Sequence, residues 1–139
     1  MSTDGMVGVV VVTHGPAGGD MLATIGRLLG AAMVQGMVAV DVKVGDGKEA
    51  IAAQITAAIG AVESGAGVLV ACDLHGSTPA NCAVELTRGL SEVAVISGVS
   101  LPMLIKLATG HRGTTPAGLA QAAVDTAIRS IRVEGGRTS

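Results

Sequence analysis

The sequence contains no phenylalanine, tryptophan or tyrosine among its 139 residues. Aromatic side chains are the usual platforms on which single-stranded nucleic acid stacks its bases, so their absence argues against such a ligand. Basic residues are also few, with 9 Lys and Arg against 11 Asp and Glu, and they form no run that would follow a phosphate backbone. We therefore expect no nucleic-acid partner, and a core built from Val, Leu, Ile, Met and Ala.

Cysteine is scarce as well, since only Cys72 and Cys82 are present. Two cysteines are too few for a disulfide framework or a metal cluster, and both fall among apolar residues, so we predict buried free thiols and no metal site. The sequence has no Walker loop or dinucleotide fingerprint, and no cofactor is expected. The first residues, MSTDGM, do not resemble a secretory signal, and no apolar stretch reaches membrane-spanning length. These absences predict a soluble, cytoplasmic protein with no membrane insertion.

Two apolar runs predict the central strands, Val7 to Val12 and Val68 to Cys72. Runs without polar alternation are typical of strands that are buried on both faces of a parallel sheet. Further strands are predicted at 38–42 and 93–96, and residues 131–134 (IRVE) predict a short edge strand. Apolar residues at three- and four-residue spacings predict helices over 21–33, 48–62, 79–88, 101–108 and 116–130.

Strands that alternate with helices predict a single three-layer, doubly wound α/β domain over residues 1–139, with a mostly parallel sheet and frayed ends at 1–6 and 135–139. Asp20 suits the N-cap or the first turn of the first helix, and Thr78 suits the N-cap of the third helix. The buried face of the first helix is predicted to comprise Met21, Leu22, Ile25, Leu28, Leu29 and Met33.

Polar turns follow two of the buried strands, at Thr13 to Gly15 and at Asp73 to Thr78. If these strands are neighbours, His14 and Asp73 face one another at the carboxyl edge of the sheet, where α/β proteins bind ligands. A carboxylate that accepts a hydrogen bond from one ring nitrogen fixes the tautomer and leaves the other nitrogen as a nucleophile. Backbone N–H groups at Gly76 to Pro79 and at the start of the first helix would suit a phosphate. These pieces favour a phosphoryl-carrying histidine over an acyl-transfer triad, because no Gly-x-Ser-x-Gly elbow is present.

Plainer interpretations exist for the same residues. His14 could be a solvated residue at a strand end, Asp73 could form an Asx-turn, and Thr78 could simply start a helix. Three further loop residues are expected to face solvent: His75, Ser77 and His111.

Three motifs, taken in order, resemble a known family: THG after the first strand, DLHGSTPAN after the third, and VISGVSLPMLIKL beyond it. Together they are similar to enzyme IIA of the mannose type in the bacterial phosphoenolpyruvate:sugar phosphotransferase system (PTS). The resemblance runs from about Val7 to the last helix. It implies four parallel strands and a fifth, antiparallel strand that is exchanged between the two subunits of a homodimer, which residues 131–134 would supply here.

The resemblance also implies roles at the sheet edge. His14 matches the histidine that accepts a phosphoryl group at Nε2 from the carrier HPr and passes it to an enzyme IIB. Asp73 matches the acid that orients the ring, and Thr78 matches a hydroxyl near the phosphoryl group. The expected phosphoryl-binding turns contain Gly15, Gly76, Ser77 and Thr78.

The sequence departs from the family pattern in the second turn, where the family commonly has an aromatic residue and a second glycine in place of His75 and Ser77. The aromatic ring would pad the docking rim for protein partners, and His75 is a candidate accessory residue instead. No enzyme IIB sequence follows, so the acceptor would be a separate IIB or a regulatory protein. Two alternatives stay open: a non-catalytic regulatory module that binds a protein through the same edge, and the phosphotransferase subunit of dihydroxyacetone kinase.

Overall fold

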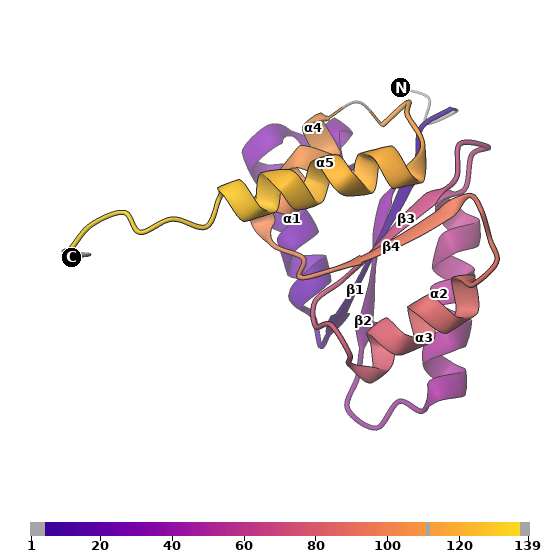
Figure 1. Ribbon diagram of the computed structural model, residues 1–139. Coiled ribbons are helices and arrows are strands. Elements are labelled where there is room, and N and C mark those ends of the chain that lie inside the picture. The colour runs from indigo at the N-terminus through magenta and orange to yellow at the C-terminus, as the bar shows by residue number, and fades with distance from the viewer. Residues whose placement is uncertain (1–4, 111, 137–139) are drawn as a thin grey trace.

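In the described part of the chain, residues 5–110 and 112–136 of the computed structural model, four strands alternate with five α-helices (Figure 1). His111, expected at the surface, lies outside these residues. None of the described helices combines the length and apolarity needed to cross a lipid bilayer. The strands are β1 (Gly8–His14), β2 (Met37–Val42), β3 (Val68–Cys72) and β4 (Val93–Ser97). The helices are α1 (Ala17–Leu29), α2 (Lys48–Val62), α3 (Thr78–Thr87), α4 (Leu101–Thr109) and α5 (Pro116–Arg129), with a short 3-10 turn, η1 (Ala31–Val34), after α1.

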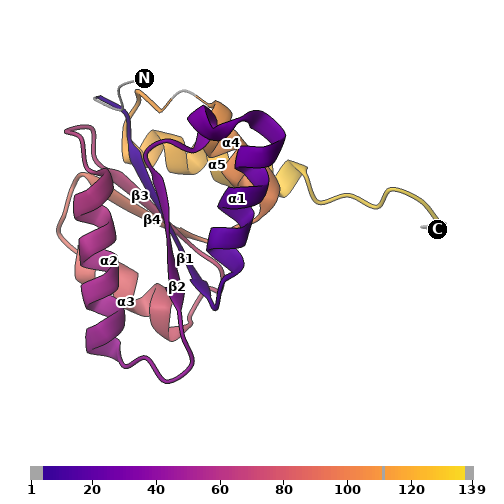
Figure 2. The same ribbon diagram turned by 180° about the vertical axis from the view of Figure 1, so that it is seen from behind.

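The strands form one sheet in the order β2-β1-β3-β4, and all neighbouring strands are parallel. Helices α2 and α3 cover one face, while α1, α4 and α5 cover the other (Figures 1 and 2). This arrangement confirms the predicted three-layer, doubly wound domain. It also places β1 and β3 side by side at the centre, so the loops that follow them meet at one edge of the sheet.

Strand β1 is buried on both faces, as its apolar run predicts. Val9 and Val11 pack with α1, α4 and α5, whereas Val10 and Val12 pack with α2 and α3, and all four are fully buried. The alternation follows from the two-residue period of a strand. By the same alternation, the Thr13 side chain points to the face of the sheet that α1 covers, and the His14 side chain points to the opposite face.

Helices α3, α4 and α5 begin in the same way, with a hydroxyl cap and a proline within the next two positions. The Ser77 hydroxyl accepts the N–H of Ala80, and Ser100 and Thr115 play the same part in the later helices. The prediction that Thr78 is the N-cap was therefore wrong by one residue. Ser77, which was expected to face solvent, is half-buried, and its hydroxyl makes this cap. Thr78 is the first residue of the helix instead.

Helix α1 differs from its prediction at both ends. It begins at Ala17, which places Asp20 in its first turn. Leu28 is 66% exposed and Leu29 is 39% exposed, although both were predicted to be buried. Leu28 lies at the margin of the apolar stripe that Leu22 and Ile25 define, and both leucines belong to the last turn of the helix, so neither is enclosed by the core.

Residues 131–134 form no strand within one chain, so the short edge strand predicted there is absent from the chain's own sheet, and its exchange between two subunits stays a prediction. Within one chain this segment runs away from the body beyond α5 (Figures 1 and 2), and Ile131 and Val133 are 84% and 75% exposed. A strand requires a neighbour for its backbone hydrogen bonds, and the segment meets neither edge of the sheet.

The two cysteines occupy different environments. Cys72 is fully buried at the end of β3, as predicted. Cys82 is only partly buried and lines a hollow between α2 and α3, so the prediction of a core position for it was wrong. Cys82 packs against the margin of the core between the sheet and the helices α2 and α3, and it shares the lining of that hollow with Ala52 of α2.

Candidate functional site

His14 and Asp73 meet at the carboxyl edge of the sheet, as the predicted neighbourhood of β1 and β3 requires. The ring Nδ1 of His14 lies 3.0 Å from Oδ2 and 3.2 Å from Oδ1 of Asp73. The same carboxylate accepts the backbone N–H of His14 at 2.9 Å and that of Leu74 at 2.9 Å. Asp73 therefore holds both the backbone and the ring of His14.

The His14 side chain is 49% exposed, whereas that of Asp73 is only 21% exposed. With Nδ1 turned toward the carboxylate, the opposite ring nitrogen, Nε2, has no hydrogen-bond partner among the described residues. The ring is thus anchored on its inner side and open on its outer side. A carboxylate partner favours a proton on Nδ1, which leaves the lone pair on Nε2.

The hydrogen bonds of Asp73 also govern its ionisation. Burial raises the pKa of this carboxyl, but the backbone and ring N–H groups of His14, the charge of His14 and the N–H of Leu74 lower it, and the net pKa lies below the ordinary value of 3.8. Asp73 is consequently a carboxylate at neutral pH. A fixed negative charge beside Nδ1 can stabilise a positive charge that develops on the ring.

The turn between β1 and α1 is held by several internal hydrogen bonds. Gly15 adopts φ +62°, a left-handed conformation that suits glycine, and its N–H donates to the carbonyl of Val42 at 2.7 Å. The N–H of Gly18 donates to Thr13 Oγ1 at 2.7 Å, and that of Gly19 donates to Asp41 Oδ1 at 3.3 Å.

The N–H groups of Gly15, Gly18 and Gly19 are therefore engaged inside the protein, and of the expected phosphate donors at this turn these three are already occupied.

The loop between β3 and α3 supplies free donors instead. The hydroxyl of Ser77 donates to the carbonyl of Leu74 at 2.7 Å and also caps α3. The backbone N–H groups of Gly76 and Thr78 have no acceptor among the described residues. They stand at the N-terminus of a helix, where backbone N–H groups favour anions.

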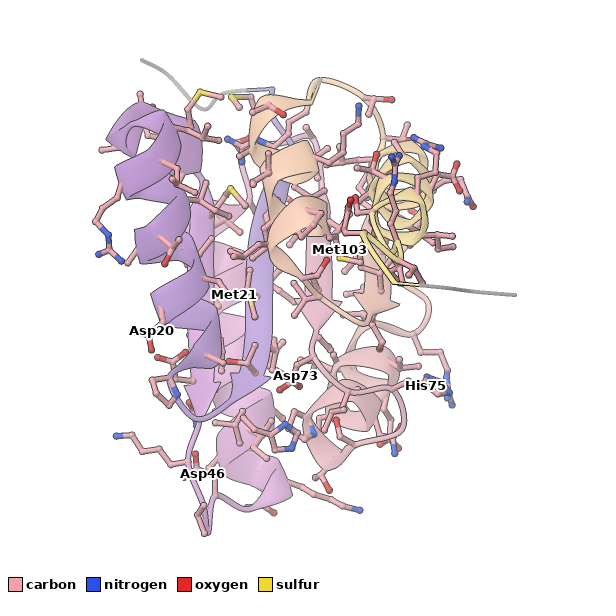
Figure 3. All side chains as sticks on the ribbon, turned by 90° about the vertical axis from the view of Figure 1, so that its left-hand side faces the viewer. Asp20, Met21, Asp46, Asp73, His75 and Met103 are labelled. Carbon is pink, nitrogen blue, oxygen red and sulfur yellow. The ribbon has the colours of Figure 1, made fainter. Side chains whose placement is uncertain are left out.

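His75 lies in this loop but not against the acid. Its side chain is exposed, and it projects outward from the edge at which Asp73 points inward (Figure 3). The structure therefore brings together His14 and Asp73 and leaves His75 apart from that pair.

The sheet edge that carries His14 is open to solvent, as the half-exposed ring shows. Two surface hollows of about 290 and 380 Å³ lie elsewhere: one lies between α2 and α3, the other at the turn from α3 to β4, and neither includes His14 or Asp73. Exposed apolar side chains stand in the edge loops and at the start of α4, namely Val44, Leu74 and Leu101. Small-molecule ligands are usually enclosed in pockets, whereas an open edge with apolar neighbours is better suited to contact with another protein.

Three buried polar residues were not predicted from the sequence: Thr13, Thr87 and Arg112. Thr13 is fully buried under the first turn of α1. The only sign of this in the sequence is a hydroxyl residue at the end of a valine run. Arg112 is 4% exposed, and its guanidinium donates to the carbonyl of Gln35 at 2.6 Å. Burial lowers the pKa of Arg112, whose backbone carbonyl meets the start of β1, far from the edge that carries His14. The described residues contain no group of three or more side chains that could hold a metal ion.

Several solved structures share this fold. The mannose/sorbose-specific IIA subunit of the phosphotransferase system from Enterococcus faecalis has a TM-score of 0.84 at 20% identity, with 96% of this chain and 98% of that chain covered. The phosphotransferase component EIIA from Streptococcus agalactiae has a TM-score of 0.79 at 20% identity, with 92% and 97% covered. The PTS IIA protein associated with the fucose utilization operon of Streptococcus pneumoniae has a TM-score of 0.79 at 19% identity, with 95% and 96% covered.

At these identities the likenesses show the fold alone, and no curated protein matches the sequence. A family model gives the closer assignment: residues 8–124 match EIIA-man, described as the PTS system fructose IIA component. That span contains both His14 and Asp73. The chain therefore belongs to the EIIA-man family of phosphotransferase-system IIA components, which are in general phosphotransferases that work with HPr and an enzyme IIB.

Proposed function

We propose that this chain is a phosphoryl carrier that takes a phosphoryl group from phospho-HPr on Nε2 of His14 and passes it to an enzyme IIB or to a regulatory acceptor. The observation that carries this proposal is the one-sided anchoring of the ring, with Nδ1 3.0 Å from Asp73 and Nε2 open. Covalent catalysis by histidine uses this arrangement, in which one ring nitrogen is held by a basic partner and the other acts as the nucleophile.

The transfer is a simple exchange of N–P bonds. The Nε2 lone pair attacks phosphorus, the Nε2–P bond forms, and the N–P bond of the donor phosphohistidine breaks with its electron pair returning to the donor ring. The His14 ring keeps its Nδ1 proton and becomes cationic, and the carboxylate of Asp73 stabilises that charge. Transfer to the acceptor reverses these changes. Both steps exchange one N–P bond for another bond to phosphorus, so neither step needs a metal or a nucleotide.

The phosphoryl oxygens need donors near Nε2, and the loop before α3 is the candidate. The N–H groups of Gly76 and Thr78 are free and stand at a helix N-terminus, and the Thr78 hydroxyl is exposed. Gly15 and Ser77 act differently in this proposal. Gly15 shapes the turn through its positive φ, and Ser77 caps the helix that presents Thr78.

We also propose that the active form is a homodimer. Strand β4 is an edge of the sheet, and the apolar side chains of Ile131 and Val133 are exposed on a segment with no partner in its own chain. An unpaired edge is a template for an added strand. Pairing residues 131–134 with the partner's sheet would satisfy the segment's backbone and bury both side chains.

The test of the carrier role is phosphoryl transfer from phosphoenolpyruvate through enzyme I and HPr, with the product mapped by acid lability and mass spectrometry. We expect one acid-labile phosphate on His14, no label on a folded His14→Ala variant, and full label on the matched His75→Ala variant. Label that survives in His14→Ala would contradict the proposal, as would the absence of label on the native protein beside active HPr. Incubation of the labelled chain with a IIB then separates a relay, which loses the label, from a regulatory module, which keeps it.

A further inference from the structure

Thr13 has hydrogen bonds that set it apart from the other buried threonine. It is fully buried, and its hydroxyl accepts the N–H of Gly18 at 2.7 Å and donates to the carbonyl of Gly15 at 3.3 Å. Thr87 is also buried, but its hydroxyl donates only within its own helix, to the carbonyls of Ala83 at 2.7 Å and Val84 at 3.4 Å. The Thr13 hydroxyl thus ties together two points of the chain that follow His14.

The bond to Gly18 replaces a helix cap that the sequence does not provide. Helix α1 has Pro16 at its N-cap position, and proline has no side-chain oxygen to accept the first free N–H groups. Thr13 reaches up from the end of β1 to do so. The helix lies directly on it, because a Cβ atom on Gly18 would stand 3.0 Å from Thr13 Oγ1 and 3.2 Å from its Cγ2.

His14 is therefore held from both faces of the sheet. Its ring and backbone N–H are bound to Asp73 on the side of α3, and the residue before it is clamped to the turn and to α1 on the opposite side. Because side chains alternate along a strand, a shift of the Thr13 backbone changes the direction in which the His14 side chain leaves the sheet edge.

We propose that Thr13 is a positioning residue for phosphoryl transfer, which fixes the direction of Nε2 through its hydrogen bonds to Gly15 and Gly18. The proposal rests on the carrier function of His14. Transfer between two histidines is sensitive to alignment, since reacting atoms must meet at near-bonding distance and a displacement of about 1 Å can cost about 100-fold in rate. Thr13 touches neither the phosphoryl group nor the donor, so its effect is transmitted through the position of His14.

The test compares Thr13→Val, which keeps the shape and removes the hydroxyl, with Thr13→Ser, which keeps the hydroxyl. We expect Thr13→Val to lower kcat for phosphorylation by about tenfold with the KM for phospho-HPr unchanged, and Thr13→Ser to stay within about twofold of the native rate. The 15N shifts of the His14 ring should move away from the Nδ1–H tautomer in Thr13→Val and not in Thr13→Ser. Thr87→Val is the matched control, since it removes a buried threonine hydroxyl away from the site.

Several results would overturn the proposal: a folded Thr13→Val with native kcat and native ring shifts, or an equal loss of kcat in Thr87→Val, which would mark a general effect of stability. If Thr13→Val fails to fold, Gly18→Ala crowds the same contact from the helix side, and a native kcat in that variant also contradicts the proposal. Failure of the carrier function gives a different result from failure of this proposal. The native protein would then take no label, while the 15N shifts of the ring would still report whether Thr13 positions His14.

Discussion

Replacing Asp73 with asparagine tests the hydrogen bonds that hold His14. Each carboxylate oxygen faces a backbone donor at 2.9 Å, Oδ2 the N–H of His14 and Oδ1 the N–H of Leu74. An asparagine amide has one oxygen and one NH2 group, so in either orientation its NH2 group confronts a backbone N–H. At least one charge-assisted hydrogen bond is lost, and the bond to the ring Nδ1 becomes a neutral one.

The size of the effect follows from those bonds. A hydrogen bond to a charged group contributes about 1.5 to 3 kcal/mol, which corresponds to a loss of about 10- to 100-fold in the rate of phosphorylation if it acts in the transition state. Asp73 holds the inner side of the ring, whereas the donor approaches the outer side, so we expect the loss in kcat and not in the KM for phospho-HPr. Initial rates with increasing phospho-HPr measure both quantities.

The same variant should change the response to acid. Because the folded-state pKa of Asp73 is lowered, its contribution to stability is present above its ordinary value of 3.8 and is lost as the pH falls through the lower folded-state value. The difference in unfolding free energy between native protein and Asp73→Asn should thus be largest near neutrality and shrink in acid. An unchanged kcat in a folded variant, or a difference that is the same at neutral pH and in acid, would refute this account of Asp73.

Two further predictions concern other parts of the chain. Burial and the neighbouring charge of Asp73 raise the pKa of Cys72 to about 12, whereas Cys82 is partly exposed, so a thiol reagent at pH 8 should modify one cysteine in the folded protein and both after unfolding. Rapid modification of a Cys82→Ser variant would contradict that assignment. Truncation after Ser130 should convert a dimer into a monomer by light scattering, because it removes the segment proposed to join the partner's sheet, and a truncated chain that remains dimeric would rule out that role for it.

Much of the fold could be predicted from the sequence because its strands carry unambiguous patterns. The valine run of β1 and the run of β3 indicate burial on both faces, and the polar turns that follow them point to the carboxyl edge. The order of strands in space could not be derived from these runs alone. It determines that β1 and β3 are neighbours, and the meeting of His14 and Asp73 depends on it.

The errors have local physical causes. Ser77 and Thr78 are both good caps, and only the backbone geometry distinguishes which of them accepts the N–H of Ala80. The pattern at 131–134 has the composition of a strand, but composition does not supply the neighbouring strand that its backbone requires. Leu28 satisfies a helical spacing and still lies at the margin of the buried stripe. Each of these features depends either on a contact between residues distant in the sequence or on the backbone conformation of a single helical turn.

The register of the two central strands explains why the site is built from these residues. Val12 pairs with Cys72, and the N–H of Asp73 donates to the carbonyl of Val12 at 3.1 Å, which is the last backbone hydrogen bond between the two strands. Two residues beyond Val12, the N–H of His14 donates to the side chain of Asp73 and not to its backbone carbonyl. The side chain thus takes over the pairing where the sheet ends, and that leaves its second oxygen free to bind Leu74 and to face the ring. A one-residue slip of β3 against β1 would turn its side chains to the opposite face, so the chemistry of His14 depends on the same packing that fixes the register.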